Sequence, residues 1–160
     1  MAEDQATDER AMLEKLVEAS RFAMLTTVDS RGHLVSRPMT VQEHDGDRFL
    51  FITQRANEVA VDSDGREVNL SIVGDSSWGS LAGTGSISDD VETKKRLWSV
   101  FNDAYTEGGP ENPDNVVLTI TMHDAEYWDS PGGVATLLGV AKARITGGKP
   151  PQGEHGTVAL

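Results

Sequence analysis

Short segments that alternate between apolar and polar residues make up most of the chain, and tight-turn sequences separate them. Alternation with a period of two is typical of strands that have one covered face. Together with stretches rich in β-branched and apolar residues, it predicts strands at residues 22–28, 34–42, 49–53, 68–73, 80–88 and 116–122, with a short seventh strand at 126–128. Pro38 cannot donate a backbone hydrogen bond, which indicates that the second strand either lies at an edge of its sheet or is irregular there.

Helical spacing of apolar residues appears at the ends and between some of the strands. Met12, Leu13, Leu16 and Val17 would share one face of a helix that begins at Glu9. Shorter helices are predicted at residues 57–64 and 135–145.

A further helix is predicted where Asp89 is followed three residues later by Glu92, as in a capping box. We expect it to end near Tyr105 and to turn its apolar side chains inward, namely Leu97, Trp98 and Phe101.

Together these elements predict a mainly β (α+β) fold, in which a small barrel carries helices at its ends. A length of 160 residues suits one domain. We expect a disordered tail at residues 1–8, the folded domain at 9–146 and a loose tail at 147–160.

The net charge of −12 repels phosphate backbones and anionic lipid, so we expect neither a nucleic acid nor a membrane as partner. No apolar stretch approaches the roughly 20 residues that span a bilayer, and the N-terminus lacks a signal-peptide pattern. We therefore expect a cytoplasmic protein.

The chain offers little of the usual catalytic or metal-binding chemistry. It has no cysteine, and none of its four histidines forms a pair at helical spacing, so we expect no metal site. No acid–base constellation stands out, and no catalytic residue is assigned.

Two polar spots interrupt otherwise good strands. Arg37 lies in mid-strand, where a planar guanidinium suits a phosphate or the carbonyl edge of a flat ring. At residues 53–57 a strand runs through a polar turn into a helix, where backbone donors together with Thr53 and Asn57 could hold a phosphate. The alternatives from the residues alone are a structural salt bridge at Arg37 and an ordinary helix cap at 53–57.

Several segments, in order and with compatible spacing, make the sequence resemble the pyridoxamine 5′-phosphate oxidase-like flavoproteins. They lie at residues 22–27, 36–39, 51–53 and 68–71. Later segments resemble the bacterial general stress protein branch of that family, and they lie at residues 80–85, 97–98, 108–110 and 126–129.

This resemblance implies a six-stranded split β-barrel, a homodimer, and FMN bound in a groove between the subunits. It implies that Arg37, Pro38, Met39 and Thr40 line the edge of the isoalloxazine ring, and that Thr53, Gln54 and Asn57, next to Ile52, hold the phosphate end. It also implies that Ser77 and Trp78 reach the flavin from the other subunit.

The sequence departs from the family pattern at the phosphate end. The family usually has a lysine there, whereas this chain has Asn57-Glu58-Val59, and the true oxidases carry another lysine where this chain has Gln42. Their C-terminal substrate-binding segment has no match either, which argues against oxidation of vitamin B6.

The resemblance leaves four functions open. The first is a flavin-dependent oxidoreductase with a small-molecule redox partner and an unknown substrate, in which the flavin carries the chemistry. The second is a non-catalytic flavin-binding or storage module. The third is a relative that uses FAD or a deazaflavin instead of FMN, and the fourth is a dimer that has lost its cofactor.

Overall fold

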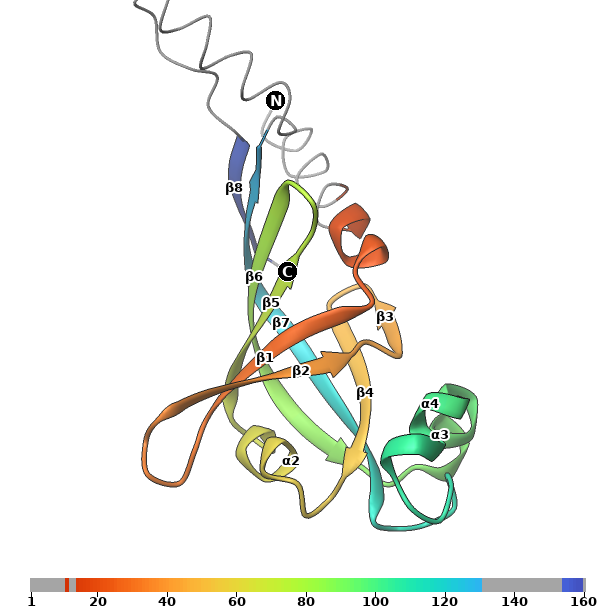
Figure 1. Ribbon diagram of the computed structural model, residues 1–160. Coiled ribbons are helices and arrows are strands. Elements are labelled where there is room, and N and C mark those ends of the chain that lie inside the picture. The colour runs from red at the N-terminus through yellow and green to blue at the C-terminus, as the bar shows by residue number, and fades with distance from the viewer. Residues whose placement is uncertain (1–10, 12–13, 131–153, 160) are drawn as a thin grey trace, which may run out of the picture.

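The alternating segments form one curled antiparallel sheet, seen in a computed structural model that describes residues 11, 14–130 and 154–159 (Figure 1). The strands in this described part are β1 (Phe22–Val28), β2 (Leu34–Thr40), β3 (Glu43–Asp45), β4 (Arg48–Gln54), β5 (Glu67–Val73), β6 (Ser77–Ser88), β7 (Asn115–Asp129) and β8 (Glu154–Ala159). The fold is the expected split barrel, in which the short strands β3 and β8 add to the six expected ones.

The strand order is β2-β1-β5-β6-β7-β4-β3, so β2 lies at an edge, as Pro38 indicated. The long strand β7 pairs with β6 along one side. Its other side pairs with β4 over the first half and with β8 over the second half. This arrangement divides the molecule into a lower end near β4 and α2 and an upper end near β8 (Figure 1).

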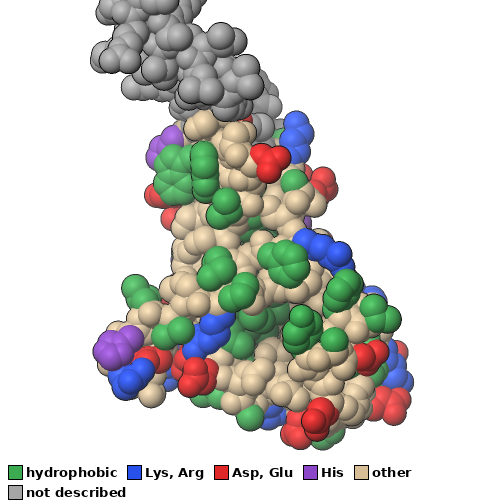
Figure 2. All heavy atoms as spheres, viewed as in Figure 1, with side chains coloured by type: hydrophobic (Ala, Val, Ile, Leu, Met, Phe, Trp, Pro, Cys, Tyr) green, Lys and Arg blue, Asp and Glu red, His purple; other side chains and the backbone are tan. Residues whose placement is uncertain are grey.

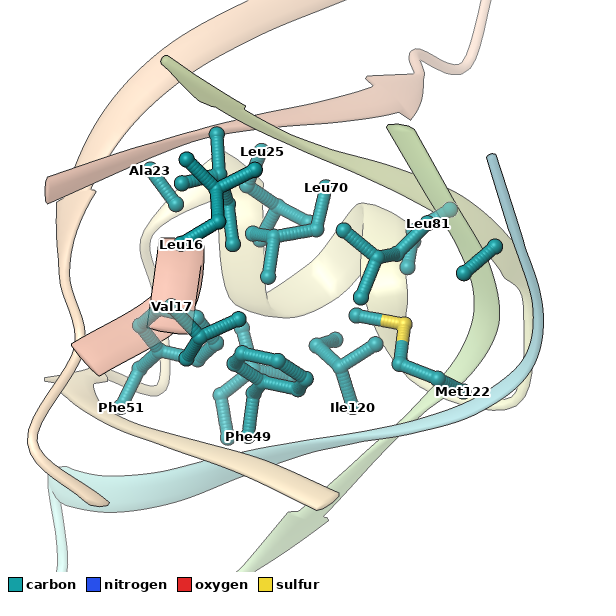
Figure 3. Packing of buried hydrophobic residues seen from close by; sticks show 14 of the residues in the cluster. Leu16, Val17, Ala23, Leu25, Phe49, Phe51, Leu70, Leu81, Ile120 and Met122 are labelled. Atoms are coloured by element: carbon teal, nitrogen blue, oxygen red, sulfur yellow. The ribbon is translucent and has the colours of Figure 1, made fainter. Parts of the chain in front are cut away.

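Apolar side chains from the inner face of the sheet fill the barrel (Figure 3). Leu25, Phe51, Leu70, Leu81 and Ile120 are all fully buried in this cluster. Residues 14–19 are helical and insert Leu16 and Val17 between the strands, as their spacing predicted. A smaller cluster of Leu50, Leu97 and Val117 lies on the other face of β4 and β7.

Three short helices follow: α2 (Glu58–Ser63), α3 (Val91–Leu97) and α4 (Val100–Tyr105). Helix α2 lies close against β6 because Gly85 has no side chain, and a Cβ there would come within 2.2 Å of the carbonyl oxygen of Ser63. Helices α3 and α4 correct the prediction of a single helix at 89–105.

The break between α3 and α4 has a local cause. Trp98 is extended and ends α3, and Ser99 begins α4 with a capping box that Asn102 completes. Phe101, predicted to face inward, is half exposed as a result. The N-cap of α3 is Asp90 rather than Asp89.

Three strand predictions are also corrected. Residues 77–79, predicted as loop, begin β6, and the segments 116–122 and 126–128 form one strand with a bulge opposite Ala82 and Gly83. Glu154–Ala159, predicted as part of a loose tail, pairs with β7 as β8. The predictions for residues 1–8 and 135–145 lie outside the described residues. In the described part of the chain, no helix is long and apolar enough to cross a membrane.

Candidate functional site

Arg37 lies on the inner face of the edge strand β2, opposite Leu25 of β1. Its Nη1 donates a hydrogen bond of 3.0 Å to the hydroxyl of Thr27, which is fully buried and lies two residues further along β1. The hairpin of β1 and β2 therefore fixes the direction of the guanidinium, whose side chain is 22% exposed.

Two acidic side chains of α2 meet the same guanidinium. Nη2 of Arg37 donates to Oε2 of Glu58 at 2.8 Å and lies 3.9 Å from Oδ2 of Asp62. Glu58 and Asp62 are four residues apart, so both lie on the face of α2 that is turned toward β2. The structural ion pair that the sequence left open for Arg37 is thus present.

Thr53 and Asn57 also come together, at the end of β4 and the start of α2. The side-chain amide of Asn57 donates to the hydroxyl of Thr53 at 3.2 Å, and Thr53 is buried. Asn57 is the N-cap residue of α2, but its side chain makes no cap hydrogen bond. Glu58, which contacts Arg37, directly follows Asn57 in the chain. We call this set of residues the Arg37 cluster: Thr27, Arg37, Thr53, Asn57, Glu58 and Asp62.

The other predicted residues of this region contribute differently. On β2, Met39 packs against the core, whereas Pro38 is exposed on the outer face. Because β2, which contains Thr40, is an edge strand, alternate backbone groups along it are not paired with another strand.

On β4, Ile52 turns its side chain away from Thr53 and packs against the smaller cluster. Gln54 ends the strand opposite Asn115. The next residue, Arg55, lies at a distance of 3.5 Å from a carboxylate oxygen of Asp89.

Ser77 and Trp78 are not brought to the Arg37 cluster. They begin β6 at the upper end of the sheet and line a pocket there together with Leu16, Tyr127 and Trp128. Within one chain, therefore, the predicted site residues fall into two separate groups.

Sequence reasoning missed Thr27 and Asp62 as members of the site. The spacing of Glu58 and Asp62 was a usable signal, because acids four residues apart on a short helix share a face. Thr27 could have been found from the hairpin register, which places it diagonally across from Arg37. Among the described residues, no group of three His, Asp or Glu side chains is arranged to hold a metal ion.

The residues of the Arg37 cluster fit one end of FMN better than the other. Arg37 and the open backbone of β2 offer donors to the carbonyl edge of a planar ring. The phosphate end meets a different environment, since Arg37 and Arg55 are both paired with carboxylates and Glu58 is 83% exposed beside Asn57. A dianionic phosphate is therefore poorly matched by this chain alone.

Comparison with known proteins gives independent evidence on the family of this chain. Residues 8–151 match the family described as pyridoxamine 5′-phosphate oxidase like. Protein bli-3 of Neurospora crassa is 30% identical over 150 residues, which cover 84% of this chain and 72% of that protein.

Solved structures of similar fold include proteins of the same family. A protein of Jannaschia sp. CCS1 assigned as general stress protein 26 is 29% identical with a TM-score of 0.70, covering 91% of this chain and 94% of that chain. The general stress FMN/FAD binding protein of Xanthomonas citri is 25% identical with a TM-score of 0.67, covering 79% of this chain and 92% of that chain.

Proposed function

Since the chain belongs to the pyridoxamine 5′-phosphate oxidase-like family, in its general stress protein branch, we propose that it binds FMN between two copies of itself. We further propose that it works as a flavin-dependent oxidoreductase with a small-molecule redox partner. The bound flavin would accept and return electrons, and the protein would position it and set its electrostatic environment.

The observation that carries this proposal is the position of Arg37. A half-buried guanidinium on an edge strand, fixed by a hydrogen bond to Thr27, presents a rigid set of donors beside open backbone groups. Such a set suits the carbonyl and nitrogen edge of an isoalloxazine ring. The relative from Xanthomonas citri, an FMN/FAD binding protein, supports the same ligand class.

The proposed dimer is supported by an exposed apolar row at the upper end of the sheet: Phe22, Val73, Trp78 and Trp128. Val73 pairs with Trp78, and Trp78 pairs with Trp128. Phe22 begins β1, two residues before Met24, which pairs with Ser71 of β5. Each of the four is at least 39% exposed, and Figure 2 shows hydrophobic side chains gathered on the surface of the sheet.

Several large apolar side chains exposed on one face of a sheet are typical of an interaction site. A second copy of the chain would cover the apolar row. It would also bring Ser77 and Trp78 to the flavin of its partner, which one chain cannot do for itself.

Purified protein and the variant Arg37→Ala test the proposal. We expect a yellow protein with a flavin absorption spectrum, and an FMN affinity at least tenfold lower in the variant, about 1.4 kcal/mol. Arg48→Ala is the matched control because Arg48 forms an exposed ion pair with Asp45 in the β3–β4 turn. Equal FMN affinity in both variants and the wild type would remove Arg37 from the site.

The same preparation identifies the cofactor and separates an enzyme from a store. Mass measurement of the extracted chromophore distinguishes FMN from FAD and from a deazaflavin. Reduction of the bound flavin by NADH or NADPH, followed by reoxidation by an acceptor, supports the oxidoreductase. A flavin that binds but is never reduced supports a storage module instead, and a colourless protein that binds no added flavin contradicts the whole proposal.

A further inference from the structure

Glu58 joins the two halves of the candidate flavin site. Its carboxylate accepts a hydrogen bond of 2.8 Å from Arg37, which belongs to the proposed ring edge. Its backbone follows Asn57, which belongs to the proposed phosphate end. Glu58 therefore lies between the two proposed halves of the site.

The charge of Arg37 is already balanced without Glu58. Asp62 is only 9% exposed and lies 3.9 Å from Nη2 of Arg37, so the guanidinium neutralises a buried carboxylate that would otherwise be costly. Glu58, which is 83% exposed, adds a second carboxylate to the same guanidinium. One positive and two negative groups leave a net charge of −1 on the Arg37 cluster.

We propose, on the basis of the flavin site above, that Glu58 is a specificity-determining residue. Its charge weakens binding of the FMN phosphate and leaves binding of the flavin ring unchanged. A phosphate monoester brings between one and two further negative charges to a cluster that is already negative. Arg55, the nearest other cation along the chain, is itself paired with Asp89.

The flavin ring is uncharged, so the carboxylates of the Arg37 cluster do not repel it. A guanidinium has five N–H donors, and Thr27 and Glu58 each accept a hydrogen bond from one of them. Donors remain for an uncharged ring carbonyl, whose approach costs no like-charge repulsion. The chain is thus expected to hold FMN mainly by its ring.

Riboflavin and FMN test this inference directly, because they share the ring and differ only in the phosphate. We expect the wild type to bind the two with affinities within about threefold of each other, a difference of about 0.65 kcal/mol. In Glu58→Gln we expect FMN affinity to rise about tenfold while riboflavin affinity stays within about twofold. Glutamine keeps an oxygen that can accept from Arg37, so the fold of α2 is preserved.

Glu107→Gln is the matched control, because it removes the same charge from an exposed glutamate on the loop after α4. It should leave the ratio of FMN to riboflavin affinity unchanged. A wild type that prefers FMN by more than about tenfold, or an equal change of the ratio in both variants, would overturn the role of Glu58.

A second measurement separates this inference from the flavin proposal. If neither flavin binds, the proposed function fails, and Glu58 is then tested with inorganic pyrophosphate alone. The thermal midpoint of Glu58→Gln should rise more with pyrophosphate than that of the wild type or of Glu107→Gln, against potassium chloride at equal ionic strength. Equal rises in all three proteins would overturn the inference without reference to any flavin.

Discussion

Lys94 is a fully buried cation on α3 whose hydrogen-bond acceptors are backbone carbonyl groups. Its Nζ donates to the carbonyl oxygens of Asn112 and Asn115 at 3.1 and 2.9 Å. We expect Lys94→Met to lower the free energy of unfolding by about 2 kcal/mol, because two buried carbonyls lose a charged donor. Urea unfolding of the variant and the wild type measures this change.

The neighbouring Lys95 offers a matched control for Lys94. It is exposed and pairs with Glu111 at 2.9 Å, an ion pair that water screens. Lys95→Met should therefore change stability much less than Lys94→Met. Similar losses of unfolding free energy in the two variants would show that the hydrogen bonds of Lys94 do not stabilise the packing of α3 against the start of β7.

At the scale of single residues, the sequence predicted that Arg37 needs an acceptor but did not identify its partners. A cation in mid-strand is visible in the sequence because it breaks the alternation and needs an acceptor. Thr27 and Asp62 give no such signal, since a threonine in a strand and an aspartate on a helix are ordinary. Their roles follow from the strand register and the position of α2, which long-range packing decides.

Helix α3 depends on its N-cap, and this makes one element sensitive to acid. The side-chain hydroxyl of Thr93, followed by its backbone N–H, donates to the carboxylate of Asp90 and holds the pKa of Asp90 below its ordinary value of 3.8. A pKa that is lower in the folded state stabilises the protein above the unfolded value, and this stabilisation is lost as the pH falls through the folded value.

Asp90→Ala should therefore be less stable than the wild type at pH 6, and the difference should shrink below pH 3.8. Asp90→Asn is the control, because asparagine also caps helices but does not titrate. Its stability relative to Asp90→Ala should not depend on pH in this range. Thermal unfolding of the three proteins across pH 3–6 gives the comparison, and a pH-independent deficit in Asp90→Ala would rule out the carboxylate as the cause.

At the scale of elements, strand existence was predictable and strand ends were not. The content of β-branched and apolar residues located β1 to its last residue, because a turn sequence, Asp29 to Gly32, follows it directly. The single strand β7 was divided in the prediction because a bulge opposite Gly83 shifts the alternation at His123. Gly83 permits that bulge, since a Cβ there would lie 2.5 Å from the carbonyl oxygen of Thr121.

At the scale of the whole molecule, the sequence predicted the split barrel through its resemblance to a family rather than through its pattern alone. The alternation gives strands but not their order, and β5 lies between β1 and β6 only because the barrel closes around one core. The separation of Ser77 and Trp78 from Arg37 is likewise a property of the complete sheet. A second copy would be needed to bring Ser77 and Trp78 to the flavin site, and this proposed dimer can be tested without measuring flavin chemistry.

Trp78→Glu is expected to separate the dimer. Trp78 lies between Val73 and Trp128 in the apolar row. A second copy packed on this row would bury the new carboxylate without water or a hydrogen-bond partner. We expect the dimer dissociation constant to rise at least tenfold, about 1.4 kcal/mol, in sedimentation equilibrium. Tyr105→Glu introduces the same charge on α4, where the tyrosine is 84% exposed outside the row, and it should leave the dimer intact. If Trp78→Glu stays dimeric, or if both variants dissociate alike, the apolar row is not the interface, and Ser77 and Trp78 lose their route to the flavin of a partner.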